Sequence, residues 1–245
     1  MTPGTGLLLL VAGLVAGFVN TVAGGGSAIT LPILTDLIGA NAANGTNRIA
    51  ILMANATAAG RFTRGGAMPW RAVAPLIPPA VLGAIAGAWV ATLLSAVAMK
   101  RVFAVVLLLI AVSVVAKPSA WLKGHRSRLT EPWRSAAFFA IGFYGGFVQA
   151  GVGFLLLAGL VLGGGLDLVR GNAAKVLLIL CYTPVALLLF ARASQVDLAI
   201  GLALGVGNSS GALLASHLAI TKGADWIRWV LVVVAVGAAI RMAFL

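Results

Sequence analysis

Acidic residues are scarce in this chain: its 245 residues include only five aspartates and glutamates, and charged residues of both signs make up 9%. Cysteine occurs once, and histidine twice, at His125 and His217. A membrane-embedded enzyme or a metal centre would need several His, Cys, Asp or Glu side chains gathered together. The sequence therefore argues against an enzyme and predicts neither a metal nor another cofactor. A buried carboxylate relay for protons is also disfavoured, because the acidic residues lie near the ends of apolar segments.

Hydrophobic residues dominate what is present. They account for 61% of the chain, and the mean hydropathy is +1.09, whereas about a quarter of the residues in a soluble domain are charged. We therefore expect an all-α, polytopic integral membrane protein in contact with lipid, with room for about seven to ten spans. The net charge of +12 does not indicate a nucleic-acid partner, since the basic residues stand singly or in small groups between apolar runs, where they set topology.

A polar, glycine-rich break interrupts the first apolar run. The break is Asn20-Thr21-Val22-Ala23-Gly24-Gly25-Gly26-Ser27, and a weaker copy is Gln149-Ala150-Gly151-Val152-Gly153. Three consecutive glycines favour local unwinding of a helix. In lipid, a broken backbone is tolerated only where it is buried in protein or lines a wet cavity. Corresponding breaks in two halves of a chain therefore indicate a transporter's binding site.

The apolar runs predict helices of unequal length. We expect Leu7–Thr21 to form one helix and Ala28–Ile38 a second, whose eleven residues rise only about 16 Å and cannot cross a hydrocarbon core of ~30 Å. The next helix should open at Asn44–Arg48, whose Asn and Thr side chains are natural caps, and should continue to about Gly60. Val73–Leu94, kinked by three prolines, and Val102–Ala116 should then span the membrane.

The pattern repeats after a polar linker. We expect residues 1–116 to form a first transmembrane repeat, 117–134 a cytoplasmic linker, and 135–245 a second repeat. The matched residues are Gly13 and Gly142, Gly17 and Gly146, Asn20 and Gln149, Asn44 and Asn172, Gly83 and Gly207, and Gly87 and Gly211. The Gly-xxx-Gly spacing of several of these pairs favours close helix packing, within one subunit or across a homodimer.

Charge counting orients the chain. If each break closes a re-entrant hairpin and three longer helices cross in each half, twelve of the seventeen basic residues share one side, which the positive-inside tendency makes cytoplasmic. Three is an odd number of crossings, so the repeats would be inverted, and they stay inverted if the short helices span. Breaks that are mere kinks would give no inversion, an arrangement that we favour less. Tryptophans beside loops fit an interfacial belt: Trp70, Trp121, Trp133, Trp226 and Trp229.

The two breaks predict a site for a small anion, because free amides and the positive end of the helix dipole attract anions at a helix N-terminus. The residues expected there are Asn20, Gly24, Gly25, Gly26, Ser27, Gln149, Gly151 and Gly153, with Thr46, Asn47, Arg48, Asn172 and Lys175 at the starts of the following helices. Lys175 stands where Asn47 stands in the first half. It could bind the ligand or extend to the membrane interface, and for Arg48 we favour extension.

Two sets of motifs, one in each half, point to a known family. They are Gly17-Phe18-Val19-Asn20 with Gly24-Gly25-Gly26 and Gly45-Thr46-Asn47, and then the stretch from Gly142 to Gly153 followed by Asn172-Ala173-Ala174-Lys175. Together they resemble the sulfite exporter TauE/SafE family of membrane permeases. The resemblance implies a bacterial inner-membrane protein of two related halves that moves small anions such as sulfite, sulfoacetate or other sulfonates. The second half departs from the family pattern, with two glycines at its break and Asn-Ala-Ala-Lys at its helix start.

We therefore expect a multi-pass inner-membrane transporter that exports sulfite or organosulfonates by alternating access. No coupling ion is needed for export, since the membrane potential supplies about 2.3 kcal/mol per charge per 100 mV. Uptake of a small carboxylate or another organic anion is the alternative of the same kind. A membrane-embedded enzyme or a non-transporting scaffold is the alternative of another class, and an absence of flux would identify the scaffold.

Overall fold

The protein is built of helices. The computed structural model describes residues 2–116 and 130–244, and every regular element within them is helical, as the composition predicts. The elements are α1 (Pro3–Val22), α2 (Ser27–Ile38), α3 (Ala40–Arg64), α4 (Trp70–Val73), α5 (Ile77–Thr92), α6 (Ala96–Ala116), α7 (Trp133–Phe147), α8 (Val152–Ala158), α9 (Leu168–Arg192) and α10 (Leu198–Phe244). A 3-10 segment, Ala74–Leu76, joins α4 to α5, and a π-helical segment, Gly159–Gly163, continues α8.

Several helices are long and apolar enough to cross a membrane. Among the described residues, four segments meet this condition: Pro3–Val22, Trp70–Thr92, Leu168–Arg192 and Leu198–Gly223. Large apolar side chains on their outer faces, such as Leu7, Leu82 and Leu198, are 60% exposed or more. Such an apolar exterior suits acyl chains and not water. The expected all-α, multi-pass membrane protein is confirmed.

Each half begins with a helix that breaks and is followed by a short one. Between α1 and α2, Gly24 adopts a φ of 87°, and α2 then starts at Ser27. Between α7 and α8, Gln149 and Gly151 adopt φ angles of 69° and 71°. α2 has 12 residues and so rises about 18 Å, too little to cross the hydrocarbon core. The predicted interruption is confirmed, and the short helix has one residue more than Ala28–Ile38.

The helices after the two breaks begin earlier than the sequence indicates. α3 starts directly after Gly39, which makes no side-chain cap, so the prediction that Asn44–Arg48 caps this helix is wrong. α9 starts at Leu168 with the carboxylate of Asp167 as its cap, and Asn172 lies in its next turn. In α3, Asn44 and Thr46 stand inside the helix because distant segments supply their partners: Asn44 donates to the carbonyl of Phe147, and Thr46 accepts from the amide of Asp197.

The proline-rich stretch before α5 bends as predicted. Pro75 lies in the 3-10 segment, and Pro78 and Pro79 lie in the first turn of α5, where a missing amide removes no interior hydrogen bond. α6 starts at Ala96, six residues before the predicted Val102.

Several residues that the sequence singled out lie outside the part of the chain that the structure describes. They are residues 117–129, with Trp121 and His125, and the side chain of Trp229. Trp133 and Arg134, which were expected in the linker, belong to the first turn of α7. Trp70 and Trp133 are more than half exposed, as an interfacial belt requires, whereas Trp226 packs edge-on against Phe18.

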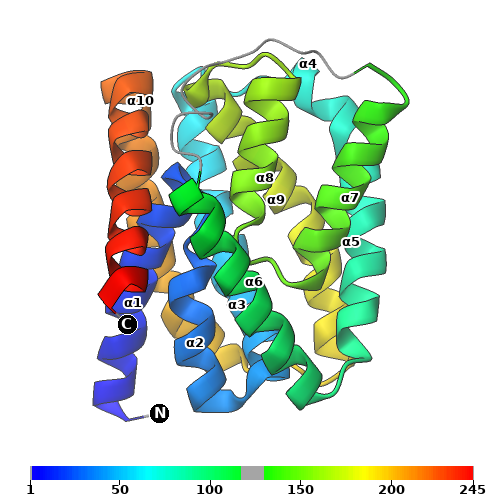
Figure 1. Ribbon diagram of the computed structural model, residues 1–245, viewed down its shortest axis with the longest axis vertical. Helices are drawn as coiled ribbons and strands as arrows, with labels where there is room; N and C mark the ends of the chain where they lie inside the picture. The colour runs from blue at the N-terminus through cyan, green and yellow to red at the C-terminus, as the bar shows by residue number, and fades with distance from the viewer. Residues whose placement is uncertain (1, 117–129, 245) are drawn as a thin grey trace.

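The first helix of each half packs against a helix of the other half. α1 lies along the first part of α10, and α7 lies along α5, at opposite sides of the molecule (Figure 1). Glycines allow both contacts: a Cβ added at Gly17 would overlap the backbone of Asn208, and one added at Gly87 would overlap the carbonyl of Phe143. The packing role predicted for the matched Gly-xxx-Gly pairs is therefore confirmed within a single chain.

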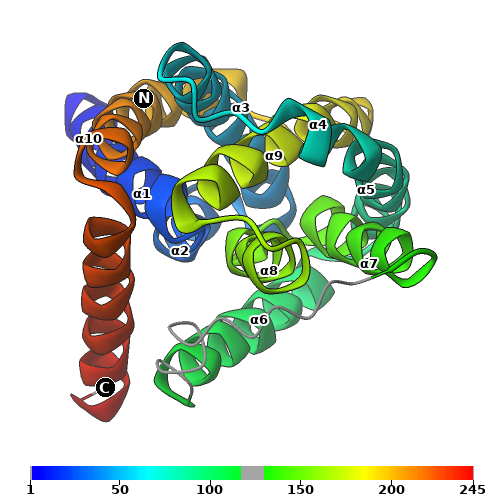
Figure 2. The ribbon, with the colours of Figure 1, turned by 90° about the horizontal axis from the view of Figure 1, so that it is seen from above.

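The remaining helices complete the two halves around a buried centre. α3 packs on α10 and α9, and α9 packs on α5. Gly223, with φ 73° and ψ −162°, divides α10 into two helices. Seen from above, α6 and the part of α10 after Gly223 extend away from the other helices on the same side of the molecule (Figure 2). In Figure 1, α1 begins at the lower edge and α7 near the upper edge.

Candidate functional site

The two glycine breaks meet at the centre of the protein. The Cα atoms of Gly24 and Gly153 are so close that a Cβ on either would overlap the other's backbone, and the ring of Phe154 lies beside Gly25. Gly26 packs with the same closeness against the carbonyl of Ala16 in α1. The glycines therefore bring two backbones together. In the conformation seen here, each break closes on the other.

The start of α2 presents backbone amides at this junction. Within the described residues, the amides of Gly25, Gly26 and Ser27 donate no hydrogen bond, and all three residues are buried. The first amides of any helix lack partners inside it, and they carry the positive end of the helix dipole. Side chains hold this helix start in place: the Asn47 amide donates to the Ser27 hydroxyl at 3.2 Å, and the Thr30 hydroxyl donates to Asn47 Oδ1 at 2.8 Å.

Lys175 of α9 is fully buried beside the first break. Its Nζ donates to the carbonyl oxygens of Asn20 and Thr21, at 3.0 and 2.8 Å, and to Oδ1 of Asn172 at 2.7 Å. The two carbonyls belong to the last turn of α1, where unpaired carbonyls carry the negative end of the dipole. Lys175 therefore does not extend to the membrane interface. It caps the broken helix of the other half.

Arg48 of α3 occupies the corresponding place beside the second break. Its guanidinium donates to the carbonyls of Gly145 and Gly146 in the last turn of α7, and to Oε1 of Gln149 at 3.2 Å. It also lies 4.5 Å from the centre of the Phe190 ring, in cation–π contact. Arg48 is fully buried, so the expectation that it extends to the interface is wrong.

The two cations are equivalent in the structure, although the sequence comparison pairs Lys175 with Asn47. Each stands on the same helix face as an asparagine one turn earlier, Asn44 for Arg48 and Asn172 for Lys175, and donates to that asparagine. The spacing is four residues in α3 and three in α9, and both spacings place side chains on one face. Because the spacings differ by one residue, an alignment of the two halves at a fixed offset does not pair Arg48 with Lys175.

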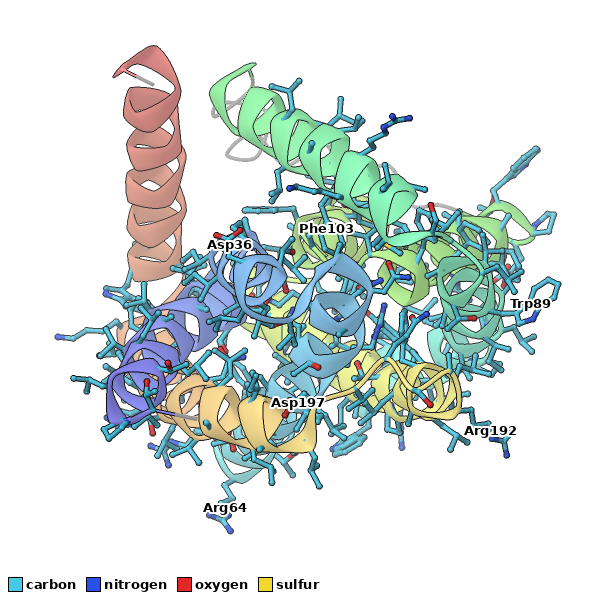
Figure 3. The ribbon with its side chains drawn as sticks, turned by 90° about the horizontal axis from the view of Figure 1, so that it is seen from below. Asp36, Arg64, Trp89, Phe103, Arg192 and Asp197 are labelled. Atoms are coloured by element: carbon cyan, nitrogen blue, oxygen red, sulfur yellow. The ribbon has the colours of Figure 1, made fainter. Side chains whose placement is uncertain are left out.

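No acidic side chain compensates these cations within the described residues. The ion pairs found there are Arg134 with Glu131 and Arg170 with Asp167, both near helix starts. Burying an uncompensated cation costs several kcal/mol even after relaxation. By contrast, Arg64 and Arg192 project from the outside of the bundle, as does Trp89 (Figure 3). The centre of the protein is therefore electropositive and suited to a negatively charged ligand.

Of the other predicted residues, some lie in the cluster around the breaks, and others have side chains that do not take part in it. Gln149 lies within the cluster, since its amide nitrogen also donates to the hydroxyl of Tyr182 at 3.3 Å. Gly151 is the residue before α8. Thr46 does not join the cluster, because its hydroxyl accepts from the amide of Asp197 in the loop before α10. The side chain of Asn20 makes no hydrogen bond among the described residues, although its carbonyl binds Lys175.

Sequence reasoning missed part of this cluster. Tyr182 and Phe190 of α9 contact Gln149 and Arg48, and Tyr144 donates to the carbonyl of Ala150 in the second break. A signal was present, because the chain contains only two tyrosines and both contact this break. Beside the two breaks, the buried donors Arg48 Nε and Asn172 Nδ2 remain without a partner in the described residues. Uncommitted buried donors of this kind are available to a ligand.

Metal ligation has no support in the described residues, where no group of three or more His, Cys, Asp or Glu side chains could hold an ion. The side chains gathered at the breaks are donors: an ammonium, a guanidinium, amides and hydroxyls. Such a set recognises the oxygens of an anion through charge-assisted hydrogen bonds.

Known proteins resemble this chain over nearly its whole length. The family model described as Sulfite exporter TauE/SafE matches residues 9–242. "Probable membrane transporter protein ORF9" of Sinorhizobium sp is 30% identical over 96% of this chain and 90% of its own length. "Probable membrane transporter protein YfcA" of Escherichia coli K12 is 27% identical over 94% and 86%, and a "Probable membrane transporter protein" of Haemophilus influenzae is 24% identical over 97% and 94%. No solved structure is significantly similar to this chain.

Proposed function

Because this chain belongs to the sulfite exporter TauE/SafE family, we propose that it is a permease that exports sulfite or organosulfonates. Membership of the family and the relatives' names support a membrane transporter. The choice of substrate rests on the family's description and on the chemistry of the centre. Export would proceed across the bacterial inner membrane, without a cofactor and without covalent chemistry.

The pair of buried cations at the junction of the breaks is the observation that carries this proposal. Arg48 and Lys175 have no carboxylate partner among the described residues, so an anion that enters between the breaks offsets part of their desolvation cost. The amides of Gly25, Gly26 and Ser27 would add donors from the positive end of α2. A sulfite or sulfonate group has three oxygens, which can accept from several of these donors at once.

Alternating access would move the two breaks relative to each other. We propose that residues 1–116 and 135–245 are inverted repeats joined by the cytoplasmic linker 117–134, because the first helix of each half packs on the other half and because α1 and α7 begin at opposite edges (Figure 1). In such transporters one repeat rocks against the other around a central site. The contact of Gly24 with Gly153 would then be the closed centre, which must open to admit substrate from either side.

The experiment that tests the proposal is a flux assay on purified protein in proteoliposomes. Sulfite, sulfoacetate, methanesulfonate, sulfate and acetate would be loaded in turn, with protein-free liposomes as the control. We expect flux of sulfite or of a sulfonate, and the transported anion should raise the melting temperature of the protein, because a ligand that binds the folded form stabilises it. Flux of acetate alone would establish the alternative of carboxylate transport. Absence of flux for every anion would refute the transport proposal.

A further inference from the structure

A second cluster of basic residues lies outside the two breaks and is not used by the proposed transport site. It lines a cavity of about 120 Å³ between the region of α4, the start of α7 and the π-helical segment after α8. Liquid water occupies about 30 Å³ per molecule, so the cavity has room for a small anionic group. Its polar side chains are Arg71 and Arg134, and its apolar lining includes Pro75, Leu76, Phe138 and Leu160.

The charges of this cavity are only partly balanced. Arg71 makes no hydrogen bond or ion pair in the part of the chain that the structure describes, whereas Arg134 pairs with Glu131 at 2.8 Å. Hydrogen bonds from Ser135, together with Arg134, lower the pKa of the Glu131 carboxyl, so this carboxylate is ionised and balances one arginine. The cavity therefore keeps one net positive charge, on Arg71.

The position of the cavity points to the headgroup layer of the membrane. Each arginine directly follows an exposed tryptophan: Trp70 is 54% exposed and precedes Arg71, and Trp133 is 71% exposed and precedes Arg134. Exposed tryptophans concentrate where acyl chains meet headgroups. Arginines beside an apolar cavity lining at this level complement a phospholipid, whose phosphate and acyl chains meet there.

The backbone at the cavity is also unusual. Gly159, Leu160 and Gly163 of the π-helical segment line it, followed by Gly164. π-Helical turns inside helices are rare and occur frequently at functional sites. Glycines at this turn carry no side chains that would fill the space beside the arginines.

We propose that this cavity binds the phosphate of an anionic phospholipid, held by Arg71 from the first half and Arg134 from the second. Basic pockets between transmembrane helices bind lipid headgroups by the same chemistry. A lipid in this place bridges α4 and α7, next to the contact between α5 and α7 in which Gly83 packs on Phe139, the residue after Phe138. Its binding should therefore stabilise the junction of the two halves.

The test measures lipid binding to delipidated protein in detergent, by native mass spectrometry and by thermal shift. The probes are phosphatidylglycerol, zwitterionic phosphatidylethanolamine and inorganic phosphate. The variants are Arg71→Gln and Arg134→Gln, and the matched control is Arg64→Gln, which removes the same charge from an exposed arginine a few residues before Arg71. Melting temperatures without lipid establish that each variant is folded.

We expect phosphatidylglycerol to bind more tightly than phosphatidylethanolamine and to raise the melting temperature. Binding should be about fivefold weaker in Arg71→Gln, as expected for one basic residue near an anionic lipid, and unchanged in Arg64→Gln. Equal binding of phosphatidylglycerol to the parent and to folded Arg71→Gln overturns the proposal. A thermal shift that inorganic phosphate reproduces in full also overturns it, because the ligand would then be a soluble anion.

Discussion

Replacement of Lys175 by methionine tests whether the buried cation serves the substrate or only the fold. Methionine is flexible, similar in length and uncharged. The ammonium of Lys175 makes three hydrogen bonds of 2.7 to 3.0 Å. Hydrogen bonds to charged groups contribute about 1.5–3 kcal/mol each, so their loss removes roughly 5–9 kcal/mol. The variant also no longer bears the desolvation of a buried ammonium, which costs several kcal/mol. These effects largely cancel, and we expect the free energy of unfolding to fall by at most ~3 kcal/mol.

The effect on substrate should be larger than the effect on stability. A single negative charge about 5 Å from the ammonium, at an effective dielectric constant of about 20, gains roughly 3 kcal/mol. Loss of this attraction weakens binding by about two orders of magnitude. We therefore expect Lys175→Met to remain folded and to need about a hundredfold more sulfite for the same flux in proteoliposomes.

Lys100→Met is the matched control, because Lys100 is an exposed lysine of α6. It should transport sulfite like the parent. If folded Lys175→Met also retains the parent's sulfite dependence, the anion does not bind beside this cation, and the uncompensated charge of Lys175 does not attract the substrate.

Three further predictions concern the breaks, the packing of the halves and the driving force. Gly24→Ala should lose flux and lower the melting temperature, because the new methyl group overlaps the backbone of the second break. The control is Gly66→Ala, at a similarly positive φ with open space around it, which should show only the strain of placing an alanine at that φ. Equal effects of the two substitutions would contradict the closed junction. Gly87→Ala should destabilise the protein, because the new methyl group overlaps the Phe143 carbonyl. Its control is Gly60→Ala in α3, which has no neighbour within 4 Å and should stabilise the protein by up to ~1 kcal/mol. Thermal unfolding measures both effects. Efflux of sulfite should accelerate when an inside-negative potential is imposed with potassium and valinomycin, since each 100 mV supplies about 2.3 kcal/mol per charge, and a rate independent of potential would indicate electroneutral coupling.

The membrane class, the two breaks and the short second helix follow from local properties of the sequence. Apolar runs of sufficient length must enter lipid, and consecutive glycines disfavour a continuous helix wherever they stand. The packing role of the Gly-xxx-Gly pairs could also be predicted, because close helix contact leaves no space for side chains. Each of these features depends on neighbouring residues alone, so the folded protein could confirm it without altering it.

The starts of α3 and α9 were mispredicted for a physical reason. Asn44 and Thr46 are good caps in isolation, but a buried polar side chain inside a helix is equally stable when another segment supplies its partner. Asn44 donates to the carbonyl of Phe147, and Thr46 accepts from the amide of Asp197. Those partners are about a hundred or more positions away in the sequence, and no local sequence pattern predicts them.

What the sequence by itself determined is that the chain lies in a membrane, breaks its helices twice and carries hydrogen-bond donors near both breaks. Only the tertiary structure decided that Arg48 and Lys175 are buried and not extended to the interface, and that each caps the broken helix of the opposite half. The reason is that the cost of burying a charge depends on what surrounds it, and here the surrounding carbonyls of α1 and α7 come from the other end of the chain.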